Sequence, residues 1–157
     1  MTQYFRHLKT LMEKGIHIIK HRKKGVMNNR FLFLHNARLY WKENERALPQ
    51  KSRSIHLTKI VQVIRGKHTR AMLESSNDIK DSCCFSVQSH KFSLDLSTNS
   101  QKLCQEFVSG LRIYRSHFMN QQSKLKEVEQ RTKLSPIGVG FNPVTKKTEP
   151  KKFKFND

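Results

Sequence analysis

Acidic residues are scarce in this chain of 157 residues, in which 12 Asp and Glu stand against 31 Lys and Arg. The formal net charge is therefore +19 at pH 7. An excess of this size predicts a polyanionic partner: an anionic membrane surface, a nucleic acid or an acidic protein. The sequence also shows no apolar run long enough to span a bilayer, no signal-peptide pattern and no site for myristoylation or prenylation.

Cysteine is also rare. Cys83, Cys84 and Cys104 provide neither a disulfide framework nor a zinc-binding spacing. Adjacent residues of a strand point to opposite faces, so at least one of Cys83 and Cys84 is expected to be a buried thiol. The pattern indicates a reducing compartment and predicts a cytoplasmic protein.

Recognisable catalytic and metal-binding motifs are missing as well. The eight histidines are scattered, without the H-E-x-x-H spacing of a zinc enzyme. No Gly-rich phosphate loop and no nucleophile motif occurs. We therefore expect no enzymatic activity, no metal site and no cofactor.

Short apolar runs predict a mainly β (α+β) domain. A helix over residues 2–14 is indicated by apolar residues at helical spacing and is ended by Gly15. Strands are predicted over residues 16–22, 30–35, 38–42, 55–65, 82–88 and 91–96. A second helix over residues 99–117 carries an apolar stripe of Leu103, Cys104, Phe107, Val108 and Leu111. This order predicts a bent sandwich or barrel closed at one end by the second helix.

The alternation within the last strand predicts which of its side chains are buried. Phe92, Leu94 and Leu96 are expected to face the core, and Ser93 and Asp95 to face water. Residues 43–54 form a polar loop. The chain is polar but compatible with a helix from about 120 to 134, and its basic end is expected to be flexible.

The segment K-H-R-K-K-G-V-M-N-N-R, residues 20–30, predicts a basic hairpin loop. Lys20 and Arg22 lie two residues apart and so share one face of a strand, and Arg30 begins the returning strand. Lys23 and Lys24 lie between them. Cations that converge at one loop favour a multiply phosphorylated ligand, because they form charge-assisted bonds to phosphate oxygens. The alternative is a solvated run of charge.

Four stretches together resemble a pleckstrin homology (PH) domain, with the N-terminal PH domain of phosphoinositide-specific phospholipase C as the nearest likeness. They read K-G-I-H-I-I-K-H-R at 14–22, R-F-L-F-L at 30–34, L-Y-W-K-E-N-E-R at 39–46 and I-V-Q-V-I-R-G-K-H-T at 60–69. The resemblance implies a seven-stranded barrel over residues 15–118 closed by a C-terminal α-helix. Residues 1–14 would be a short amphipathic helix and residues 119–157 a basic, largely flexible tail.

The resemblance also implies a non-catalytic module that binds phosphoinositides or inositol phosphates and attaches peripherally to the inner face of membranes. It implies a set of headgroup ligands: Lys20, Arg22, Lys23, Lys24, Arg30, Asn44, Arg46 and Ser93. The sequence departs from the family at Phe107, where a Trp is usual, and at Glu45, where a basic residue is usual. Glu45 is expected to oppose phosphate binding.

Two other functions remain open. The chain could be a protein-interaction scaffold of the same fold, or it could bind nucleic acid through diffuse positive charge. The sequence disfavours nucleic acid, because it shows neither an aromatic platform on an exposed strand nor a recognition helix. Charge that converges at the first loop, as opposed to evenly spread charge, would favour the phosphorylated ligand.

Overall fold

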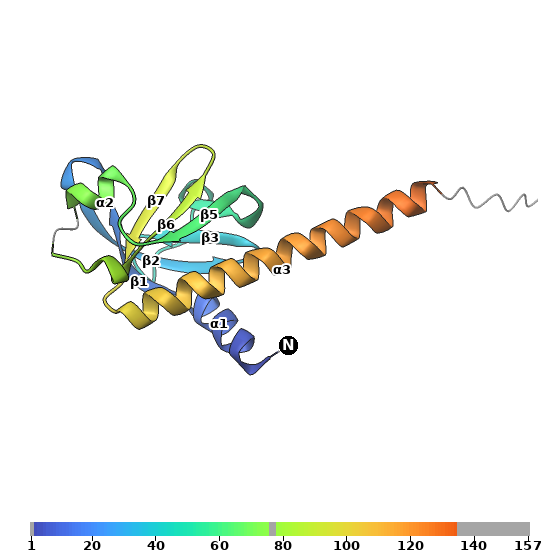
Figure 1. The fold of residues 1–157 in the computed structure, drawn as a ribbon, viewed down its shortest axis with the longest axis horizontal. Coiled ribbons are helices and arrows are strands. Elements are labelled where there is room, and N and C mark those ends of the chain that lie inside the picture. Colours follow the sequence, from blue (N-terminus) through green and yellow to red (C-terminus); the bar gives the residue numbers. More distant parts are fainter. Residues whose placement is uncertain (1, 76–77, 135–157) are drawn as a thin grey trace, which may run out of the picture.

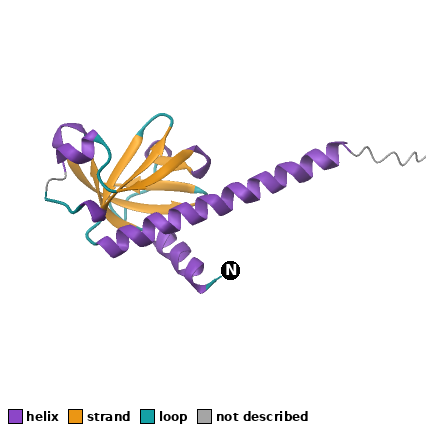
Figure 2. Ribbon diagram, viewed as in Figure 1, coloured by secondary structure: helices purple, strands orange, loops and turns teal. Residues whose placement is uncertain are grey.

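A single antiparallel sheet forms the body of the protein in the computed structural model, which describes residues 2–75 and 78–134 (Figures 1 and 2). Its seven strands follow the order β4-β3-β2-β1-β7-β6-β5. They are β1 (Ile16–His21), β2 (Met27–His35), β3 (Arg38–Lys42), β4 (Ser54–His56), β5 (Ile60–Arg65), β6 (Cys84–Ser89) and β7 (Ser93–Ser97). The helices are α1 (Gln3–Lys14), α2 (Arg70–Ser75) and α3 (Gln101–Leu134), with short 3-10 turns η1 (Lys23–Gly25), η2 (Lys51–Arg53), η3 (Leu57–Lys59) and η4 (Asp81–Cys83). The predicted fold class is confirmed.

Helix α3 packs against the sheet and contributes a large apolar side chain to the core. Phe107 and Leu111 are fully buried, and the Phe107 ring lies 6.0 Å from that of Phe85 on β6. On its flank, α3 packs against α1 at Gly110, where an added Cβ would lie 3.3 Å from the Leu8 Cβ. The predicted apolar stripe of this helix is therefore its core-facing side.

The two outermost strands of the sheet, β4 and β5, do not pair with each other. Arginines from α3 bond to the backbone of β5. The Arg112 Nε and Nη2 atoms donate to the Val63 carbonyl at 3.0 and 2.6 Å, and the Arg115 Nε donates to the Ile60 carbonyl at 2.8 Å. The carbonyls of Ile60 and Val63, on a strand at the edge of the sheet, are thus hydrogen-bonded by arginine side chains and not by another strand.

Two predicted boundaries were wrong. The expected strand 55–65 is divided into β4, η3 and β5, because the His56 side chain caps η3 by accepting a bond from the Thr58 amide and the chain turns there. The second predicted helix continues from residue 117 to Leu134, so the first part of the predicted flexible tail is helical. Residues 135–157 of that tail lie outside the described residues.

The predicted alternation of β7 was also only partly right. Leu94 and Leu96 are buried, but Phe92 is 43% exposed, since it precedes the strand in the β6–β7 turn. Asp95 was expected to face water and is 5% exposed. Its Oδ1 accepts hydrogen bonds from the Ser86 Oγ at 2.7 Å and the Ser93 Oγ at 2.8 Å, which compensate its burial.

Within residues 2–75 and 78–134, none of the helices combines the length and the apolar character that crossing a bilayer requires.

Candidate functional site

An open cavity of about 890 Å³ lies where β1, β3 and β7 meet their connecting loops. Among the described residues that line it, five are cationic and one is acidic. The acid is Asp95, and the cations are Lys20, Arg22, Lys23, Arg70 and Lys91. They come from β1 and the loop after it, from α2 and from the β6–β7 turn, so distant parts of the sequence supply one positively charged cavity.

Lys20 is a partly buried cation of this cavity. It follows Ile16 and Ile18 on the interior face of β1, and its Nζ lies 5.3 Å from the centre of the Trp41 ring. Burial lowers the pKa of Lys20 from its ordinary value, and the charges of Arg22, Arg30 and Arg53 lower it further, while Asp95 acts in the opposite direction. A bound anion would therefore stabilise the protonated amine of Lys20.

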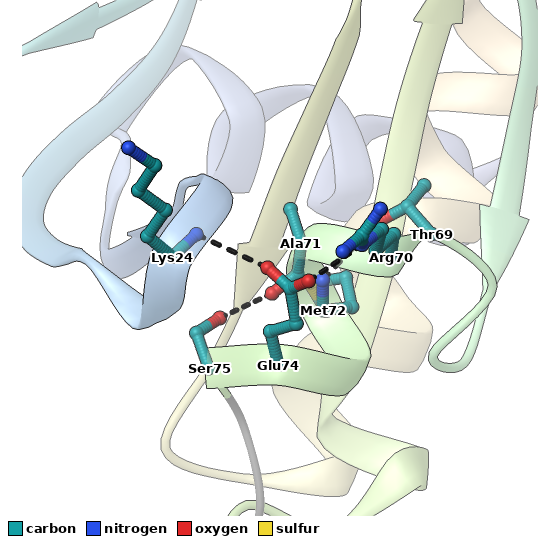
Figure 3. Close-up of polar contacts among 7 residues, drawn as sticks. All are labelled: Lys24, Thr69, Arg70, Ala71, Met72, Glu74 and Ser75. Carbon is teal, nitrogen blue, oxygen red and sulfur yellow. Dashed lines mark hydrogen bonds and ion pairs between the residues drawn. The ribbon is translucent and has the colours of Figure 1, made fainter.

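Helix α2 braces the loop between β1 and β2 (Figure 3). The Lys24 amide donates to the Glu74 Oε2 at 3.1 Å, and the Arg70 Nε donates to the Glu74 Oε1 at 2.6 Å. Lys24 has a φ of 62°, so the loop turns through a left-handed residue at the point where this carboxylate holds it. One side chain thus joins the basic loop to an arginine of the cavity wall.

Beneath α2 lies a buried polar layer. The His21 Nδ1 is 2.8 Å from the Ser75 Oγ, and the His21 Nε2 is 2.8 Å from the Ser97 Oγ. Burial lowers the pKa of His21 from its ordinary value, with Asp95 opposing that effect. The two serines connect α2 and β7 to β1 through one neutral imidazole, which fixes the position of α2 beside the cavity.

The Glu74 bridge gives a testable prediction. The hydrogen bond from Arg70 holds the pKa of Glu74 below its ordinary value. The bridge should therefore persist at neutral pH and be lost as the pH falls through that depressed pKa. We expect Glu74→Ala to speed hydrogen exchange of the Lys24 amide, measured by NMR, while the Ile18 amide in β1 is unaffected. Unchanged exchange at Lys24 would show that α2 does not brace the loop.

Solved structures with a similar fold include a PH domain. The PH domain of human TBC1 domain family member 2 protein has a TM-score of 0.52 and 16% identity, over 69% of this chain and 84% of that one. The chain has the PH fold. Two Toxoplasma gondii proteins are also similar: Inner Membrane Complex Sub-compartment Protein 1 (TM-score 0.56, 14% identity, 74% of this chain, 94% of that one) and Protein 3 (0.51, 16%, 74%, 86%).

No protein-family model matches the sequence, and no curated protein shows significant sequence similarity to it. The likeness is therefore one of fold.

Within the PH fold, half of the predicted ligands lie at the cavity. Lys20, Arg22, Lys23 and Ser93 line it. Arg30 is close enough to lower the pKa of Lys20, and its Nη1 donates to the neighbouring Asn29 carbonyl at 2.8 Å. The Ser93 hydroxyl already donates to Asp95, so it reaches a ligand only by leaving that bond.

The other predicted ligands do not line the cavity. Lys24 engages α2 through its backbone. The Asn44 Oδ1 accepts bonds from the Arg46 amide at 3.0 Å and the Ala47 amide at 2.9 Å, so that side chain closes its own turn. Glu45 lies 4.0 Å from His17, whose side chain is on the other face of β1 from Lys20. Ligand binding by all eight predicted residues stays a prediction.

Sequence reasoning missed four contributors to the site. Trp41 lies under Lys20, Arg53 adds to the local charge, and Arg70 and Lys91 line the cavity. Lys91 could have been found, because it stands two residues before the predicted ligand Ser93 in a turn. Arg70 could not, because the short helix that carries it was not predicted.

Proposed function

We propose that the protein is a non-catalytic module that binds the phosphorylated headgroup of a phosphoinositide, or the corresponding inositol phosphate, in the 890 Å³ cavity. The observation that carries the proposal is the unfavourable electrostatic environment of Lys20. Lys20 is half-buried among three arginines, and its pKa is lowered by burial and by their charge. A bound phosphate would add to the counter-charge, which among the described residues comes from Asp95.

The chemistry of the cavity suits phosphate on a ring. Arginine offers a planar fork of donors and lysine a compact point charge, and the cavity presents both kinds from more than one side. Trp41 and the exposed Phe92 have their ring centres 6.1 Å apart beside these cations, which gives an apolar surface for a ring face. The resemblance to the phospholipase C domain supports the same class of ligand.

A headgroup bound in this cavity would place the protein at the surface of a membrane. We propose peripheral attachment to the cytoplasmic face, where anionic lipids and a chain of net charge +19 attract each other. This attachment should weaken with salt, since the charges act within a Debye length of about 10 Å at 0.1 M.

The test is a titration of soluble inositol polyphosphates into the whole chain, followed residue by residue by NMR. We expect Lys20, Arg22 and Arg30 to shift together. Arg30→Ala should weaken binding at least about tenfold, because a bond to a charged group contributes about 1.5–3 kcal/mol. Lys102→Ala, on the exposed side of α3, should change binding little.

Equal losses from Arg30→Ala and Lys102→Ala would refute the headgroup site and leave diffuse polyanion binding, with nucleic acid as the first ligand to test. No shift at any of the three cations would leave the fold as a protein-interaction scaffold.

A further inference from the structure

A second cavity, of about 390 Å³, adjoins the first at the β6–β7 turn. It is bounded by β3, β4, η3 and that turn. The two cavities share Ser54 of β4 and Lys91 and Phe92 of the turn. The other residues that line the second cavity are not part of the proposed headgroup site.

The charge of the second cavity is of one sign. No carboxylate is among its described lining residues, and its five basic or titratable groups are Arg38, His56, Lys59, His90 and Lys91. Across residues 2–75 and 78–134, none of the ion pairs includes any of these five side chains. These five groups come from β3, β4, η3 and the β6–β7 turn and meet at one cavity.

Two of these side chains are partly fixed by neighbours in a way that leaves donors free. The Arg38 Nε donates to the Ser54 Oγ at 3.1 Å, which orients the guanidinium and leaves its Nη groups for another acceptor. The His56 Nδ1 accepts from the Thr58 amide at 3.3 Å, so its Nε2 carries the proton in the neutral ring. The His56 ring also packs edge-on against Phe118 of α3, at 5.7 Å.

From this arrangement we infer that the cavity between β4 and the β6–β7 turn is a second anion site, which binds a phosphate monoester group through Arg38, Lys59 and Lys91 with His56 beside them. A phosphate monoester carries up to two charges and three acceptor oxygens, which suits several donors arranged around one point. The group can belong to a lipid headgroup or to a soluble phosphate compound.

The charges around His56 agree with an anion site. Burial lowers its pKa from the ordinary value, and the charges of Arg38 on β3 and Lys59 on η3 lower it further. The other side chains that contact the ring, Thr58 and Phe118, carry no charge. A bound phosphate would offset the two cations, so by linkage it should raise the His56 pKa.

The first arm of the test uses glycerol 3-phosphate as the probe. Titrated into the whole chain, it should shift the signals of Arg38, His56 and Lys59, and at saturation it should raise the pKa of His56 measured by NMR. The double variant Arg38→Gln/Lys59→Gln should lower the affinity about tenfold or more. Its control, Lys102→Gln/Lys124→Gln, removes the same charge from exposed positions on α3 and should lower it less than about twofold.

The second arm identifies the source of the phosphate. Vesicles of phosphatidylcholine with phosphatidic acid present a monoester at a membrane, and vesicles with phosphatidylserine at equal surface charge do not. A preference for phosphatidic acid that the Arg38/Lys59 variant loses supports a lipid source; binding of glycerol 3-phosphate without that preference supports a soluble one.

The inference is overturned if the control variant loses as much affinity as the Arg38/Lys59 variant, or if glycerol 3-phosphate shifts signals evenly over the surface. This result is independent of the headgroup proposal, because Arg30→Ala reports on the first cavity and Arg38→Gln/Lys59→Gln on the second.

Discussion

Phe107→Ala should lower the free energy of unfolding by about 3–5 kcal/mol, the largest effect on stability that we expect from one substitution. The Phe107 side chain is fully buried between α3 and the sheet and lies against Phe85, so its removal leaves a cavity as well as losing apolar burial. Urea denaturation followed by circular dichroism measures the change.

Leu125→Ala is the matched control, because it shortens an apolar side chain on the same helix where that side chain is 58% exposed. It should change the free energy of unfolding by no more than about 0.5 kcal/mol. A loss below about 1 kcal/mol at Phe107 would mean that α3 does not close the core as described.

Lys20→Met should cause the largest loss of ligand affinity that we expect from one substitution, and it should raise the stability of the free protein. It removes the central cation of the first cavity, so affinity for an inositol polyphosphate should fall about 10- to 100-fold. The same change replaces a half-buried charge, crowded by arginines, with an apolar side chain that can pack on Trp41, so the melting temperature should rise. Calorimetry of binding and of unfolding measures both.

The pH dependence separates this mechanism from a simple packing gain. The pKa of Lys20 is lower in the folded chain than in the unfolded chain, so the unfolded state binds more protons between the two values. The cost in stability of burying the charged Lys20 is therefore fully present below the depressed pKa. This cost is lost as the pH rises from that pKa towards 10.5, the ordinary pKa of lysine. The stability difference between the variant and the parent chain should narrow over that range. A constant difference would contradict the charge argument.

The fold could be predicted where the sequence pattern is long and regular. The stripe that includes Phe107 and Leu111 repeats at helical spacing, and burial of those two residues is confirmed. The corner at residues 57–59 could not be predicted in the same way, because Ile55, Leu57 and Ile60 read locally as one strand. Only the cap of His56 on η3 shows that the chain turns there.

One group of errors at the site comes from helix α2, which was not predicted. Six residues are too few to show a helical period, so nothing in the sequence indicated that the polar face of β7 is covered. The burial of Asp95 and Ser97 was therefore not predicted, and in the structure His21 connects Ser97 of β7 to Ser75 of α2. Arg70 was missed for the same reason. The convergence of Lys20, Arg22 and Arg30 depends only on hairpin register, and that much could be predicted.

The arginines of α3 also restrict how a protein partner could bind. Extended peptides often join a domain by adding a strand to an exposed sheet edge, where they pair with free backbone groups. On β5 the carbonyls of Ile60 and Val63 are already occupied by Arg115 and Arg112. A peptide that added there would have to displace two charged side chains, so a partner of this protein is expected to recognise side-chain surfaces and not the backbone of β5.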